Sequence, residues 1–227
     1  MATLFETRQD TLTALSDGNT PPQALLRMGM MPVASKWDLL ALGGYMFTAK
    51  QTTIGTALAG SAAAAGGIVL TAPTFRFTVP TGTTVFPRRV NWSFAEMAGT
   101  DNEQAICYTD TATYTSGGTA ITPLNWRTDD NAPATGVTNC VHAAASAIVE
   151  AALTNVRAIY QSVVPLAFTF ATSYTLEKTV NVEWDEFIPI VGPASFLIFL
   201  SSKTTANTHY LTVDWAEVPT VSAVTGV

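Results

Sequence analysis

Four long stretches of the chain contain no Asp, Glu, Lys or Arg, and these are residues 51–75, 111–126, 158–176 and 187–202. Charged residues make up only 12% of the 227 residues, which is roughly half of the usual share in a soluble domain. A soluble monomer needs charged groups on its surface to stay dispersed, and one domain of this size cannot bury all four stretches. We therefore expect other copies of the chain to cover part of this uncharged surface, because large permanent interfaces avoid charge.

From about residue 73 onward, apolar and polar residues alternate in short segments, which is typical of β-strands. The segment 74–79 places three apolar side chains (Phe75, Phe77, Val79) on one face and three polar ones (Thr74, Arg76, Thr78) on the other. The run 196–200 is apolar throughout, which predicts a strand covered on both faces. Further strands are expected at 84–86, 90–94, 105–109, 112–115, 166–170, 176–184 and 209–218.

Turn residues recur between these strands about every 8–12 residues, a spacing that favours sandwiches and barrels over a parallel sheet. Examples are Pro80–Gly82 and Ser116–Gly118. Residues 141–160 match either a helix with four-residue spacing or two strands, and two strands are favoured because strands flank the segment. The predicted fold class is mainly β, an antiparallel β-sandwich (jelly-roll-like) over residues 71–227.

Residues 1–70 form a separate region in this interpretation, an extended arm with short helices that docks onto a neighbouring subunit. Thr20 and Pro21 are typical of a helix start and precede an apolar stretch. A second short helix is expected from Ser35 to Leu40, stopped at Gly43–Gly44. The small uncharged residues from 51 onward suit close contact with another subunit, and a flexible linker is the equally weighted alternative.

Composition argues against two classes of partner. Eleven Lys and Arg against seventeen Asp and Glu give a net charge of −6, so the chain is poorly suited to grip phosphates, and no direct nucleic-acid binding is expected. The two most apolar stretches, 58–71 and 187–200, are each shorter than the ~20 residues of a spanning helix, and no membrane association is expected. The N-terminal residues do not resemble a secretory signal.

Residues capable of chemistry are few, and they do not form a recognisable motif. The acidic residues near two tryptophans are the best case for an enzyme, since a glycosidase uses a pair of carboxylates in one cleft; they are Glu183, Asp185, Glu186, Asp214 and Glu217. A solvated acidic face is the favoured reading. The sequence lacks a P-loop, a G-x-G-x-x-G loop and a nucleophile elbow.

Metal and thiol chemistry have equally weak support. His142 and His209 lack partners at metal-ligand spacing and are read as polar strand residues. The oxygen-rich segments 101–103 and 129–131 do not fit a calcium-loop spacing and are read as turns. Two buried free thiols are favoured for the cysteines over a disulfide, and these are Cys107 and Cys140. We predict a non-enzymatic protein with no catalytic residues, no cofactor and no metal.

Three segments carry a resemblance to known proteins: 77–87 (FTVPTGTTVFP), 118–127 (GTAITPLNWR) and 184–219, which runs from Trp-Asp-Glu to Val-Pro. In their order and style they resemble β-sandwich structural proteins of bacteriophage virions, of the capsid or capsid-decoration type. The resemblance implies a jelly-roll or related sandwich that forms homo-oligomers, with a trimer favoured. It also implies packing against other capsid or virion proteins, and a location in the virion after assembly in the host cytoplasm. Shell, decoration and tail or spike roles stay open.

A second functional class is a carbohydrate-binding or adhesin-like β-sandwich. Such modules stack exposed aromatic rings on sugar rings, and the candidate side chains are Trp37, Trp92 and Trp126. Any one of these rings, if exposed, could stack on a sugar, and a glycan array without hits would remove this hypothesis.

Overall fold

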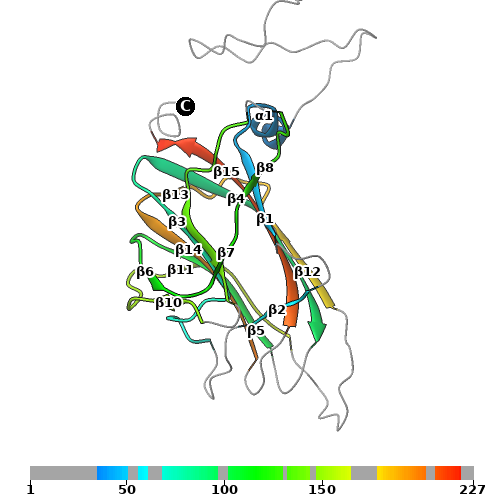
Figure 1. The fold of residues 1–227 in the computed structure, drawn as a ribbon, viewed down its shortest axis with the longest axis vertical. Helices are drawn as coiled ribbons and strands as arrows, with labels where there is room; N and C mark the ends of the chain where they lie inside the picture. The colour runs from blue at the N-terminus through cyan, green and yellow to red at the C-terminus, as the bar shows by residue number, and fades with distance from the viewer. Residues whose placement is uncertain are drawn as a thin grey trace, which may run out of the picture.

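The computed structural model describes residues 35–50, 56–60, 68–96, 102–129, 132–143, 147–164, 178–202 and 208–220. Within these ranges the chain forms two antiparallel β-sheets that pack face to face, with one short helix at one end (Figure 1). The predicted fold class, an antiparallel β-sandwich, is therefore confirmed.

The first sheet, sheet A, has the strand order β12-β4-β15-β1-β8, with β13 joined to β4 and β2 joined to β15. Its strands are β1 (Met46–Lys50), β2 (Leu58–Ala59), β4 (Thr83–Glu96), β8 (Leu124–Asn125), β12 (Lys178–Glu183), β13 (Ile190–Val191) and β15 (Thr208–Pro219). The two longest strands, β4 and β15, pair along nearly their whole length and form the centre of the sheet.

The second sheet, sheet B, has the order β11-β5-β14-β3-β9-β7. Its strands are β3 (Phe75–Val79), β5 (Asn102–Thr109), β7 (Thr119–Ala120), β9 (Thr138–His142), β11 (Arg157–Val164) and β14 (Ala194–Ser202). A separate small sheet pairs β6 (Tyr114–Ser116) with β10 (Val149–Glu150). The segment 141–160 thus contains strands in its described residues, as the neighbouring strand patterns predicted.

The chain repeatedly crosses between the two sheets. It passes from β3 in sheet B to β4 in sheet A and back to β5, and later from β11 to β12, β14 and β15 in alternating sheets. Connections of this kind are typical of jelly-roll and other Greek-key sandwiches. The first of these turns carries Gly82 with a φ of 87°, a left-handed conformation that suits glycine.

Aromatic side chains from both sheets fill the space between them. The Phe77 ring of sheet B stacks on Phe196 at 4.9 Å and on Trp215 of sheet A at 4.8 Å between ring centroids. Strand β14 is buried on both faces, as its apolar run predicted: Phe196 faces the main core, whereas Leu197 packs into a second cluster on the other face. Burial of this much apolar surface is the main source of stability of such a fold.

The polar face predicted for strand β3 is also buried, which the alternation of its residues did not indicate. Thr74, Arg76 and Thr78 are buried instead of facing solvent, and Arg76 contacts Glu150 of β10 and the Tyr114 ring of β6. Long-range contacts created by the fold, and not the local pattern, determine the burial of this face.

Part of the expected arm over residues 1–70 belongs to the sandwich, because β1 lies between β15 and β8 in sheet A. Helix α1 (Lys36–Leu42) precedes it and is the second of the two predicted helices. Ser35 caps α1 in a reciprocal capping box with Asp38, and the C-cap is Gly43. The other predicted helix, starting at Thr20, lies outside the described residues. Of the described helices, none is long and apolar enough to cross a membrane.

Candidate functional site

Three of the five acidic residues considered for catalysis, Glu183, Asp185 and Asp214, pair with arginines. Glu183, on β12, and the exposed Asp185 lie 3.7 and 3.6 Å from Nη1 of Arg88. The Asn181 amide, which donates to Glu183, and the nearby arginines hold the pKa of Glu183 below its ordinary value. This arrangement favours the ionised form of Glu183, whereas a general acid needs a raised pKa.

Asp214 and Glu217, on β15, serve structural contacts. The buried Asp214 carboxylate accepts from Arg89 at 2.7 and 2.8 Å. Glu217 accepts from the Trp215 indole at 2.7 Å and from the backbone N–H of Gly136, and so fastens the segment before β9 to sheet A. Glu186 is exposed beside Asp185.

The histidines and cysteines are buried, and both thiols are free. Burial raises the pKa of Cys107 and of Cys140 to about 12, which leaves them as unreactive thiols. His142 contacts the carbonyl oxygen of Ala143 at 2.9 Å, and His209 is buried in the core without a hydrogen-bond partner among the described residues. In the described ranges no three His, Cys, Asp or Glu side chains come together as a metal site would require.

The oxygen-rich segments 101–103 and 129–131 are only partly within the described residues. Asp129 pairs with Arg127, and that hydrogen bond lowers the pKa of Asp129. Asp101, Asp130 and Asn131 lie outside the described residues.

Two of the three tryptophans proposed as sugar-stacking platforms are buried, which corrects that part of the hypothesis. Trp92 is fully buried in the main core, and Trp37 is buried on the side of α1 that packs against sheet A. Trp126 is 44% exposed and remains available to a ligand or partner. Period-two alternation already places Trp92 on the same strand face as Val90 and Phe94, both of which are buried.

The most distinctive surface lies at the end of the molecule that carries α1. We call five of the large apolar side chains exposed at this end the α1-end surface: Leu39, Leu42, Tyr45, Leu124 and Trp126. Leu42 is 70% exposed and Leu124 is 51% exposed. Exposed apolar patches mark interaction sites in soluble proteins.

A small aromatic cluster holds α1 in place under this surface. Trp37 packs with Met46, Phe86 and Ala216 of the three central strands of sheet A. Its ring meets Phe187 edge-on at 4.8 Å, and the Lys36 ammonium lies 4.4 Å above the Phe187 ring. The helix therefore presents Leu39 and Leu42 to solvent because Trp37 occupies the buried side.

Strand β8 and the residue after it bring Leu124 and Trp126 beside β1, the strand that follows α1. Leu124 lies opposite Thr48 of β1, and the backbone N–H of Trp126 donates to Met46 at 2.9 Å. The Asn125 amide donates to the carbonyl oxygens of Gly44 (2.7 Å) and Pro133 (3.0 Å), which fixes the connection from α1 to β1 against this strand. The α1-end surface is thus built on hydrogen-bonded elements and not on a free loop.

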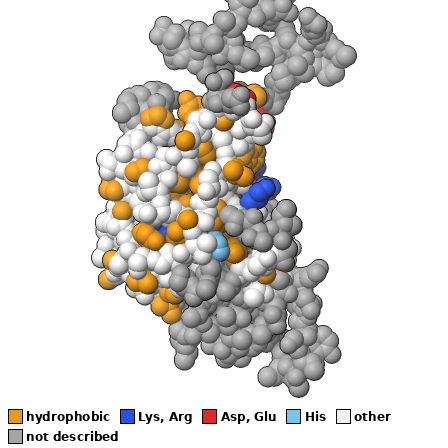
Figure 2. Space-filling model, viewed as in Figure 1, with side chains coloured by type: hydrophobic (Ala, Val, Ile, Leu, Met, Phe, Trp, Pro, Cys, Tyr) orange, Lys and Arg blue, Asp and Glu red, His pale blue; other side chains and the backbone are white. Residues whose placement is uncertain are grey.

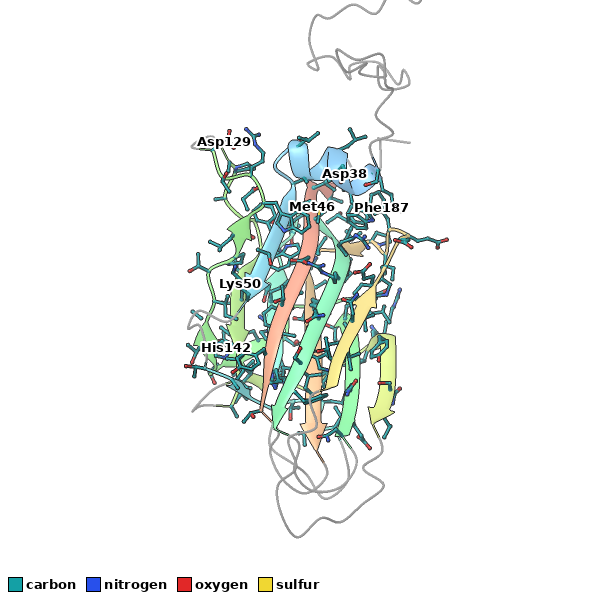
Figure 3. The ribbon with its side chains drawn as sticks, turned by 90° about the vertical axis from the view of Figure 1, so that its right-hand side faces the viewer. Asp38, Met46, Lys50, Asp129, His142 and Phe187 are labelled. Atoms are coloured by element: carbon teal, nitrogen blue, oxygen red, sulfur yellow. The ribbon has the colours of Figure 1, made fainter. Side chains whose placement is uncertain are left out.

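Charges at the border of the α1-end surface are balanced. Lys36 and Asp38 flank it on α1, whereas Arg127 and Asp129 flank it after β8. Asp38 and Asp129 both lie at the α1 end of the sandwich (Figure 3). On the face of the sandwich that Figure 2 shows, the described surface is mostly apolar or uncharged, with only small areas of charge. A neutral border around apolar side chains suits a partner that is itself poor in charge.

Comparison of the chain with protein-family models, curated proteins and solved structures gave no match.

The sequence indicated parts of the α1-end surface separately, and of its residues only Trp126 was named as a candidate for binding. The uncharged stretch 111–126 includes Leu124 and Trp126, and the predicted helix includes Leu39. Only the fold shows that they meet, because the two segments are more than 70 residues apart and are joined through β1.

Proposed function

We propose that this chain is a non-enzymatic virion structural protein that self-assembles and packs in or on a bacteriophage capsid. The α1-end surface carries the proposal, because it combines exposed apolar side chains with a neutral border in a chain of very low charge. Other copies of the chain, and other capsid proteins of similar character, are the partners that such a surface fits.

The sandwich architecture supports the virion part of the proposal. Jelly-roll sandwiches are a common architecture of viral capsid domains, although the same architecture also serves lectins and other proteins. The low charge of the chain favours the capsid role, since a monomeric lectin has no need of broad uncharged surface.

We expect the full chain to sediment as an oligomer larger than a dimer, with a trimer favoured. Changing Leu42 and Leu124 together to glutamate places two carboxylates in the α1-end surface and is expected to lower the oligomer mass. Both side chains are more than half exposed, so the change does not disturb the core. Analytical ultracentrifugation and light scattering across a hundredfold concentration range measure the effect.

Leu70→Glu is the matched control. Leu70 is also an exposed leucine, but it lies beside Thr71, next to β10 and away from α1. The control variant is expected to keep the parent mass. A parent chain that stays a monodisperse monomer at every concentration contradicts the proposal.

Carbohydrate binding is the second candidate function, and one observation favours it. Trp126 and Tyr45 are exposed aromatic rings near the Arg127–Asp129 pair, and such a combination suits stacking and hydrogen bonding to a sugar. A glycan array with hits that disappear in Trp126→Ala supports this function, whereas an array without hits removes it.

A further inference from the structure

The outer edges of the two sheets differ in how well they are protected from pairing with another chain. Sheet A ends at β12 and β13 on one side and at β8 and β2 on the other, and sheet B ends at β11 and β7. Strands β2, β7, β8 and β13 are two residues long, which leaves little backbone to pair. Strand β12 carries Lys178 and Glu183 at its ends. Short length and charge are both devices that discourage the addition of a strand.

Strand β11 lacks these protections. It has eight residues, and only Arg157, its first residue, is charged; residues 158–164 contain neither a charge nor a proline. A register shift between Ala158 and Tyr160 leaves the regular part of the strand at 160–164. No described strand pairs with its outer edge (Figure 1).

The inner side of β11 is firmly held. Residues 160–164 pair with β5 from Ile106 to Asn102. The Tyr160 ring packs against Trp92 at 5.9 Å, and the Ser162 hydroxyl donates to Gln104 at 3.1 Å. Because an edge strand turns part of its N–H and C=O groups outward, this fixed strand offers a ready template for one more antiparallel strand.

The side chains of β11 favour a second copy of the same strand as the occupant. Among residues 160–163, Gln161 and Val163 are exposed, and Val163 is 50% exposed. Antiparallel pairing of two β11 strands about Ser162 sets Gln161 of each copy opposite Val163 of the other. No charges of like sign meet, and Arg157 lies beyond the paired residues.

We propose that β11 of one copy pairs with β11 of a second copy, so that the two B sheets form one continuous sheet. This inference rests on the proposed assembly function and names one of its contacts. A two-fold axis through Ser162 generates the pairing, which removes both exposed edges at once. The α1-end surface supplies a different contact. If that contact closes a trimer, the two-fold β11 contact joins one trimer to another, and loss of the β11 contact leaves the separate trimers.

Opposite charges introduced on β11 test the contact. Gln161→Lys with Val163→Lys, or Gln161→Glu with Val163→Glu, sets like charges against each other in the paired strands. Each double variant is expected to lose the β11 contact, and a one-to-one mixture of the two is expected to recover it. The Leu42→Glu, Leu124→Glu variant is expected to be a dimer held by the β11 contact. Adding either charged pair on β11 is expected to halve its mass to that of the monomer.

The matched control places the same charges on the other long edge. Thr179→Lys with Asn181→Lys changes two exposed residues of β12 and is expected to leave the parent mass unchanged. Thermal unfolding confirms that each variant is folded, and amide hydrogen exchange of the parent is expected to show slower exchange in 160–164 at high concentration.

The outcomes separate this proposal from the proposed function. If both charged pairs keep the parent mass and the mixture changes nothing, the β11 contact is wrong while assembly through the α1-end surface stands. If an extended peptide of unrelated sequence slows amide exchange in β11, and a higher concentration of the protein itself does not, then β11 pairs with a different partner. That result overturns the self-pairing. A monomeric parent shows, before any variant is made, that the proposed function itself has failed.

Discussion

Replacing Glu150 by alanine is expected to lower the free energy of unfolding by about 3 to 5 kcal/mol, the usual cost of leaving one partner of a buried ion pair alone. Glu150 Oε1 accepts from Nε of Arg76 at 2.7 Å, and both side chains are completely buried. The substitution leaves the Arg76 guanidinium without a counter-charge on the outer face of sheet B, where water does not reach it.

The surrounding hydrogen bonds explain why the native pair is tolerated. Arg76 also donates to Thr78 at 2.6 Å and to Ser195 at 2.8 Å, and Glu150 accepts from Thr113 at 2.6 Å. Burial lowers the pKa of Arg76 from its ordinary value, and the Glu150 carboxylate opposes this change. A buried charge survives when its remaining donors and acceptors are satisfied, as they are here.

Urea denaturation followed by circular dichroism measures the change in unfolding free energy. Asp129→Ala is the matched control, because the Arg127–Asp129 pair has similar contacts but lies exposed, and little change is expected there. The double variant Arg76→Met with Glu150→Met is expected to be more stable than Glu150→Ala, since it removes both charges together. A loss below about 1 kcal/mol in Glu150→Ala would show that the pair is not a major stabilising contact.

The same network marks a limit of sequence reasoning. Strand alternation predicted the inward faces of β3 and β14 and the apolar core, since period two follows directly from strand geometry. It also assigned Arg76 to a polar outer face. Glu150, which is 74 residues further along the chain, pairs with Arg76 on that face. A local sequence pattern does not encode a contact between residues so far apart.

Local signals were informative where the chemistry is local. Ser35 and Gly43 predicted the limits of α1 because caps act within one turn of the helix. The α1-end surface was only partly predictable. The uncharged stretches indicated that exposed apolar groups exist, but their meeting point depends on the pairing of β1 with β8 and on Trp37 taking the buried side of α1.

The second large expected effect is a loss of stability in mild acid caused by His209. This residue lies on β15 with its backbone between β4 and β2, opposite Phe94 and Leu58, and both ring nitrogens lack a partner among the described residues. Burial, aided by the charge of His142, lowers the pKa of His209 to about 3, against an ordinary value of 6.5. Charging this ring in the folded protein is therefore strongly unfavourable.

The direction of the pH effect follows from proton binding. Below pH 6.5 the unfolded chain binds a proton at His209, and the folded chain does not bind it until the pH approaches 3. Stability is thus fully present above pH 6.5 and falls by about 1.4 kcal/mol for each pH unit well below it. Between pH 7.5 and pH 5.0 the expected loss is about 2 kcal/mol, a range in which most carboxylates stay ionised.

Urea denaturation at intervals between pH 7.5 and 5.0 measures this slope, and His209→Leu is expected to flatten it, because leucine fills the site without titrating. His142→Asn keeps His209 and is expected to retain most of the slope, which assigns the effect to the residue on β15. NMR titration of the folded protein gives an independent check: the His209 ring is expected to stay neutral at pH 5. A ring that titrates near pH 6.5 in the folded chain would mean that water reaches it, and the acid sensitivity would then require another origin.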